Sequence, residues 1–171
     1  MCRTKPCIDW ASSNLMHKGI DGAHVYSLKE VFDAEGETLH QFLKKKVCII
    51  GGGASGIELA YYILNRSPIL RDSRTFLDCF GLPETKESFF YPGNITVLEM
   101  GAKIGADLGS ARWIFMKQIA RYPLTMMTQT QVLKIAENYV EVLQDGEIKR
   151  IPVEFVVIAT GYRPAARELV Q

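Results

Sequence analysis

The run KVCIIGGGASG, residues 46–56, constrains the fold more than any other stretch of the chain. A short apolar strand, 47–50, leads into glycines spaced as Gly51-x-Gly53-x-x-Gly56, and the segment SGIELAYYILN that follows is typical of a helix. In such a unit Gly51 allows the tight turn, Gly53 lets the backbone approach a pyrophosphate, and Gly56 lets the helix pack close to the sheet. Free N–H groups at the start of the helix favour a negatively charged ligand. The run therefore predicts a dinucleotide-binding turn.

Composition limits the partners and the compartment. The chain has 171 residues, 23% charged and 47% apolar, which is enough for one sizeable core. Its net charge of +1 gives no electrostatic reason to expect nucleic acid or an anionic membrane surface as a partner. Four scattered cysteines do not make a disulfide framework, so we expect a reducing, cytoplasmic setting. The three histidines have no metal-ligand spacing with the cysteines, and no metal site is expected.

The apolar stretch 47–64 is long enough to suggest a membrane span. Its glycines and Glu58 argue against one, because a carboxylate near mid-span costs roughly 2.5 to 3.5 kcal/mol on insertion scales. We therefore expect no membrane-spanning segment here.

Periodicity divides the chain into an irregular N-terminal arm, 1–22, a nucleotide-binding domain, 23–165, and a C-terminal tail, 166–171. In the simple motif the acidic residue that ends the second strand follows the glycines by roughly 20 residues. Removing the segment at about 66–93 restores this distance, so that segment is interpreted as an insertion in the helix-to-strand loop. Its aromatic side chains predict a small satellite core, with a partner surface as the alternative.

The order of elements predicts an α/β fold, which resembles the Rossmann-like FAD/NAD(P)-binding fold. A central parallel sheet is built on the strands that begin at 47, 95 and 154, with helices on one side and a three- or four-stranded antiparallel β-meander on the other. Asp145-Gly146 predicts a hairpin turn within the meander. The other expected elements are a helix at 28–35, a helix at 110–121, and strands at 24–26, 95–99, 124–128, 132–136, 139–143, 148–151 and 154–160.

Two carboxylates are candidates for cofactor contacts. Glu99 ends the second strand, where an acidic residue accepts hydrogen bonds from adenosine ribose hydroxyls and favours NAD over NADP. Lys103 is the only early cation after that strand, although Arg71 and Arg74 of the insertion could reach in. Glu99 could instead be a solvated strand-end carboxylate. Glu58, in the first turn of the helix by this interpretation, either orients the nicotinamide side of a cofactor or complements the helix dipole.

Four segments carry a family resemblance: GGGASGIELA, NITVLEMGAKIGADLGSARW, RYPLTMMTQTQVLKI and VVIATGYRP. Together they resemble the NAD(P)-binding domain of the pyridine nucleotide-disulfide oxidoreductase (FAD/NAD(P)-binding) superfamily. More narrowly, they look like the 2-enoate reductase and 2,4-dienoyl-CoA reductase type of NADH:flavin oxidoreductases. In such enzymes, the resemblance implies, an N-terminal barrel holds FMN, and an iron-sulfur cluster and FAD link it to NAD(P)H. The implied cofactor-binding residues are Gly51, Gly52, Gly53, Ala54, Ser55, Gly56, Glu58, Glu99, Met100, Lys103, Ala159, Thr160 and Gly161.

The chain departs from that family in lacking a barrel, a cysteine cluster and a second glycine fingerprint for FAD. We therefore interpret it as an excised or separately encoded NAD(H)-binding domain, which delivers hydride to a flavin on another domain or subunit and is not active by itself. FAD and FMN belong only to the parent enzyme in this interpretation. Two alternatives stay open: a noncatalytic module that binds adenine dinucleotides or a partner, and a methyltransferase that uses S-adenosylmethionine.

Overall fold

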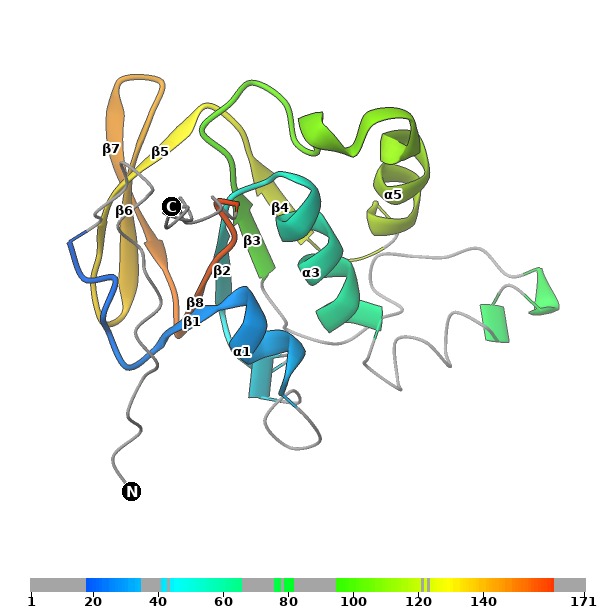
Figure 1. Ribbon diagram of the computed structural model, residues 1–171, viewed down its shortest axis with the longest axis horizontal. Helices are drawn as coiled ribbons and strands as arrows, with labels where there is room; N and C mark the ends of the chain where they lie inside the picture. Colours follow the sequence, from blue (N-terminus) through cyan, green and yellow to red (C-terminus); the bar gives the residue numbers. More distant parts are fainter. Residues whose placement is uncertain are drawn as a thin grey trace, which may run out of the picture.

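A computed structural model describes residues 18–34, 41–42, 44–65, 76–77, 79–81, 95–120, 122 and 124–161. In this part of the chain a five-stranded parallel sheet lies between helices on one side and a three-stranded antiparallel sheet on the other (Figure 1). The parallel sheet has the order β1 (Val25–Ser27), β8 (Phe155–Ile158), β2 (Val47–Ile50), β3 (Ile95–Leu98) and β4 (Leu124–Met127). The antiparallel sheet consists of β5 (Thr130–Ile135), β6 (Tyr139–Gln144) and β7 (Glu147–Pro152). The helices are α1 (Leu28–Phe32), α3 (Ala54–Asn65), the 3-10 helix η2 (Ala106–Ala111) and α5 (Arg112–Ile119).

The apolar run of β2 is buried on both faces because each face packs against a different layer. Val47 and Ile49 belong to the core beneath the helices, whereas Cys48 and Ile50 belong to the core shared with the antiparallel sheet. This is the alternation of a strand, in which successive side chains point to opposite faces. Each buried aliphatic side chain contributes about 1.5 to 3 kcal/mol of transfer free energy, so the two cores together fix the central strand.

Strand connectivity creates a crevice at one edge of the sheet. The parallel strand β2 pairs with β3 on one side and with β8 on the other, so all three end at the same edge. The chain leaves β2 through α3 toward β3, while β8 lies on the opposite side of β2. Ligands of open α/β sheets bind at such a switch point, outside the carboxyl ends of the strands.

The predicted fold class is confirmed: helices cover one face of a parallel sheet and a meander covers the other. The number of strands in each layer needs correction. The segment 124–128 could have been a fourth strand of the meander, but β4 pairs in parallel with β3 at the edge of the central sheet. The meander has three strands among the described residues. Leu124 and Met126 pack against the helix-side core while Thr125 is exposed, so an edge strand of a parallel sheet shows the same period of two as a meander strand.

The predicted helix at 110–121 is shorter, and a 3-10 helix precedes it. Gly109 has φ 55° and ψ −134° at the junction, a backbone conformation that no regular helix contains. Position 121 lies outside the described residues. None of the helices in the described part of the chain is long and apolar enough to cross a membrane.

Most of the insertion, the first part of the N-terminal arm and the tail 166–171 lie outside the described residues. Within the insertion, the rings of Phe76 and Phe80 lie 4.6 Å apart by their centroids. These side chains are 54% and 67% exposed, and the other aromatic residues of the insertion lie outside the described residues, so the satellite core stays a prediction. Lys18, near the end of the arm, accepts a hydrogen bond from the backbone N–H of Ile135 on β5.

Candidate nucleotide-binding site

Two glycines of the turn are required by the path of the backbone. Gly51 has φ 110°, and a Cβ there would stand 2.5 Å from the carbonyl oxygen of Ala159. A Cβ on Gly56 would stand 1.9 Å from the carbonyl oxygen of Gly51. The first glycine thus permits the turn between β2 and α3, and the third lets α3 lie against the turn, as the spacing predicted.

The start of α3 already faces an anion of the protein. The first helical N–H, that of Ala54, donates to Asp107 Oδ1 at 2.6 Å. A Cβ on Gly53 would stand 2.9 Å from Asp107 Oδ2, so this carboxylate lies directly over the second glycine. Asp107 belongs to η2 and was not among the predicted site residues. The segment NITVLEMGAKIGADLGSARW contains it, but no pattern in that segment indicates that η2 folds back over the glycine turn.

Glu99 holds two backbone segments together. Its Oε2 accepts a hydrogen bond from the N–H of Gly52 at 2.7 Å, and its Oε1 accepts one from the N–H of Gly101 at 2.7 Å. The half-buried carboxylate therefore connects the glycine turn to the loop that follows β3. Each carboxylate oxygen has a second lone pair that can accept a further hydrogen bond, for example from a ribose hydroxyl. The alternative of a merely solvated strand-end carboxylate is wrong.

The main chain of Glu99 is equally fixed. Its N–H donates to the carbonyl of Met127 at the end of β4, and its carbonyl accepts from the N–H of Thr130 at the start of β5. Glu99 therefore lies beside the point where the chain passes from β4 of the parallel sheet to β5 of the antiparallel sheet. Between these strands Gln129 takes φ 51°, an uncommon conformation for a non-glycine residue, and its N–H donates to the carbonyl of Gly101.

The loop between β3 and η2 is tied to the glycine turn. The N–H of Gly105, which has φ 63°, donates to the carbonyl of Gly52 at 2.6 Å. Arg112 Nε donates to the carbonyl of the preceding residue, Ile104, at 2.8 Å and holds the same end of the loop. Sequence reasoning missed both residues, because their contacts are to main-chain atoms and leave no side-chain pattern in the sequence.

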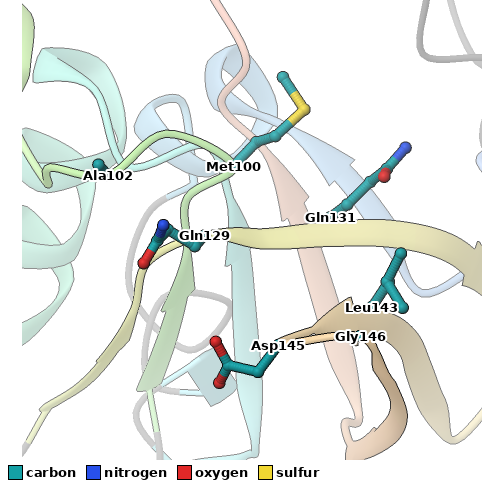
Figure 2. Close-up of a pocket in the computed structure, with 7 residues that line it drawn as sticks. All are labelled: Met100, Ala102, Gln129, Gln131, Leu143, Asp145 and Gly146. Atoms are coloured by element: carbon teal, nitrogen blue, oxygen red, sulfur yellow. The ribbon is translucent and has the colours of Figure 1, made fainter.

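Two neighbouring pockets open beside the carboxyl edge of the sheet. The first, of about 150 Å³, lies between the strand ends and β5. It is lined by Ile50, Gly51, Leu98, Glu99, Met100, Thr130, Gln131, Val132 and Thr160. The second, of about 350 Å³, extends toward the hairpin between β6 and β7 (Figure 2). It is lined by Met100, Ala102, Gln129, Gln131, Leu143, Asp145 and Gly146. Met100 and Gln131 line both pockets, which are therefore adjacent, and we call the two together the groove.

The predicted site residues divide into three groups. Those that line the groove are Gly51, Glu99, Met100 and Thr160. Those at the glycine turn and the first turn of α3 are Gly52, Gly53, Ala54, Ser55 and Gly56. Those at neither of these places are Glu58, Lys103, Ala159 and Gly161.

Glu58 does not lie in the first turn of the helix, as the sequence had suggested. Because α3 begins at Ala54, Glu58 falls in the second turn, where its side chain is exposed. Ala159 is buried in the helix-side core, and its N–H donates to the carbonyl of Ile50 at 2.7 Å. Ala159 therefore contributes to the site indirectly, because it fixes the carboxyl end of β8 against β2. Lys103 is exposed.

Cys48 lies on β2 beneath the groove and is fully buried. Burial raises the pKa of its thiol to about 12, because the thiolate is not solvated there. A thiol this far from ionisation at neutral pH is not a nucleophile, since the thiolate is the reactive form. The described site therefore offers binding groups, and Cys48 does not supply redox chemistry to it.

The strand-turn-helix unit, the strand-end carboxylate and the three-layer fold define a nucleotide-binding α/β domain. Residues 11–171 match the family described as pyridine nucleotide-disulphide oxidoreductase, and the chain belongs to that family. It is a flavin-dependent redox family whose members bind FAD and NAD(P).

Individual relatives are much longer. The chain is 33% identical over 124 residues to a metal reductase of Desulforamulus reducens, a match that covers 70% of this chain and 19% of the relative. Its fold resembles that of 2-naphthoyl-CoA reductase, with a TM-score of 0.63, 22% identity, and coverage of 87% of this chain and 18% of that one. Thioredoxin reductase of T. acidophilum is similar with a TM-score of 0.57, 20% identity, and coverage of 87% and 40%.

Proposed function

We propose that this chain is the NAD(H)-binding domain of a flavin-dependent oxidoreductase, and that it positions the nicotinamide to pass a hydride to a flavin held by another domain or subunit. The observation that carries the proposal is the position of Glu99, whose carboxylate stands at the end of β3 between the glycine turn and the groove. A carboxylate there is suited to accept hydrogen bonds from the adenosine ribose.

The charges around the groove favour NAD over NADP. The residues that line the two pockets include two carboxylates, Glu99 and Asp145, and no lysine or arginine within the described part of the chain. Lys103 lines neither pocket, so a 2′-phosphate bound near Glu99 would meet like charge without a cation among the described lining residues to offset it. Arg71 and Arg74, the other candidate cations, lie outside the described residues.

The residues present fit the dinucleotide in part. The turn at Gly53 carries no side chain, the N–H of Ala54 at the start of α3 faces the exposed side chain of Asp107, and Glu99 has free lone pairs. Glu99 would hold the adenosine ribose, the glycine turn would face the pyrophosphate, and Thr160 at the end of β8 would lie toward the nicotinamide half. The cofactor itself would supply the hydride, while the chain contributes position and electrostatics.

A role in a larger enzyme of the enoate or dienoyl-CoA reductase type is part of the same proposal. It is supported by the resemblance of the four sequence segments and by the fold similarity to a protein named for the reduction of a coenzyme A ester. The chain spans 19% of the metal reductase and 18% of the naphthoyl-CoA reductase, so the reducing centre would belong to other parts of such a protein.

Calorimetric titration of the purified chain with NADH, NADPH, ADP-ribose and S-adenosylmethionine tests the proposal. We expect NADH to bind more tightly than NADPH, and binding to be lost in Gly53→Val and weakened in Glu99→Ala. Glu137→Gln, on the exposed turn between β5 and β6, is the matched control and should bind as the wild type does. Circular dichroism establishes that each variant is folded. Absence of binding by NADH and ADP-ribose would refute the proposal, and tight binding of S-adenosylmethionine alone would replace it.

A further inference from the structure

The carboxylate of Asp107 holds the N–H group at which the helix α3 begins. Its Oδ1 accepts the hydrogen bond of Ala54 at 2.6 Å, and its Oδ2 stands 2.9 Å from the position of a Cβ on Gly53. The side chain is exposed, so the carboxylate approaches the turn from the solvent side. A ligand phosphate that binds the start of this helix approaches from the same side and needs the same donor.

The backbone that carries Asp107 is fixed to the turn that it caps. Gly105 donates from its N–H to the carbonyl of Gly52, and Leu108 donates from its N–H to the carbonyl of Gly105. The side chain therefore starts from a defined place close to α3. Among the ion pairs formed between described residues, none includes Asp107, so no described cation neutralises its charge.

We propose that Asp107 is a specificity-determining residue that competes with the pyrophosphate of the dinucleotide for the start of α3. This inference rests on the proposed function. In the free protein the carboxylate satisfies a helix N–H that otherwise has no partner. When a pyrophosphate binds, the carboxylate must leave that donor or remain beside a like charge. Asp107 thus lowers the affinity for every ligand with a phosphate at the turn and leaves adenosine unaffected.

Asp107→Asn separates the charge from the hydrogen bond, because the asparagine side chain retains an oxygen that can accept from Ala54. Two unit charges about 4 Å apart in a medium close to water interact by roughly 1 kcal/mol, which corresponds to about fivefold in affinity. We therefore expect ADP-ribose and NADH to bind Asp107→Asn about fivefold more tightly than wild type, with adenosine unchanged. The gain should shrink at 1 M salt, where the Debye length is about 3 Å. Glu137→Gln removes an exposed carboxylate elsewhere and should change none of these affinities.

Equal or weaker binding of ADP-ribose by Asp107→Asn, in a wild type that binds it, would overturn the inference and leave the proposed function intact. An equal gain for adenosine would also overturn it, because the effect would not depend on phosphate. If neither protein binds a nucleotide, the proposed function fails and the inference falls with it.

A separate measurement tests the contact without any nucleotide. The backbone amide resonance of Ala54 should shift in Asp107→Ala, which removes the acceptor, and should shift further than in Glu137→Gln. An unmoved Ala54 resonance would show that the carboxylate does not hold this N–H, and the inference would be overturned on that ground.

Discussion

Replacing Glu99 by glutamine should loosen the whole site while changing the size of the side chain very little. The carboxylate accepts hydrogen bonds from two backbone donors, one on each oxygen, at 2.7 Å from Gly52 and 2.7 Å from Gly101. A glutamine amide has one oxygen and one NH₂ group. Whichever way it is turned, the NH₂ group faces a backbone N–H, so one of the two hydrogen bonds is replaced by a contact between two donors.

The size of the effect follows from that lost bond. A hydrogen bond to a charged group contributes about 1.5 to 3 kcal/mol, and the half-buried position of Glu99 places the cost near the lower figure. For a chain of 171 residues, 1 kcal/mol corresponds to roughly 2–4 °C in the melting temperature. We expect Glu99→Gln to lower the melting temperature by about 3–6 °C. The affinity for NADH should fall by about tenfold, because the ribose loses a charged acceptor.

Thermal unfolding followed by circular dichroism, with NADH titration on the same samples, measures both quantities. Glu137→Gln controls for the loss of one exposed negative charge and should melt with the wild type. A melting temperature for Glu99→Gln within 1 °C of wild type would refute the reasoning, because the carboxylate would then not be needed to join the two loops. Loss of NADH affinity without loss of stability would leave Glu99 with a role in the ligand complex only.

Three further outcomes follow from the packing. Gly56→Ala should lower the free energy of unfolding in urea by more than about 3 kcal/mol, because its Cβ would meet a backbone oxygen at 1.9 Å. Gly146→Ala, at a position with φ 80° and open space around it, should lower it by about 1 to 2 kcal/mol. Equal losses in the two variants would contradict the close packing at Gly56. Exposed Cys79 should react with a maleimide in the native protein while Cys48 reacts only after denaturation, as read by peptide mass spectrometry. Burial raises the pKa of Cys48 from 9.0 to about 12, so the contribution of this thiol to stability is complete below pH 9 and is lost as the pH rises toward 12. The stability of a Cys48→Ala variant, measured by urea unfolding, should therefore fall less than that of the wild type between pH 9 and pH 12.

The central strands could be predicted because their sequence and their environment agree. In β2 the four residues are apolar and β-branched or small, both faces are buried, and the glycines that follow mark where the strand must end. The hairpin at Asp145 and Gly146 was equally clear, since both residues take the positive φ that such a turn requires.

The membership of β4 and the position of η2 could not be predicted in the same way. A period of two describes any strand with one exposed face, so Leu124, Thr125 and Met126 fit either sheet. The position of η2 depends on main-chain hydrogen bonds at Gly105 and on the unusual backbone of Gly109, and neither leaves a pattern in side-chain chemistry. Asp107 was missed for this reason.

The glycine turn of the free protein is held by two of its own carboxylates, and these differ in what a ligand does to them. Glu99 satisfies Gly52 from inside the fold, and its remaining lone pairs are still available to a ribose, so a ligand adds to its hydrogen bonds. Asp107 satisfies Ala54 from the solvent side, where a pyrophosphate needs the same donor, so a ligand takes its hydrogen bond away. The first carboxylate prepares the site for the adenosine half, and the second opposes the phosphate half. The two carboxylates therefore act on the affinity for a dinucleotide in opposite ways. Glu99→Gln should lower that affinity, and Asp107→Asn should raise it.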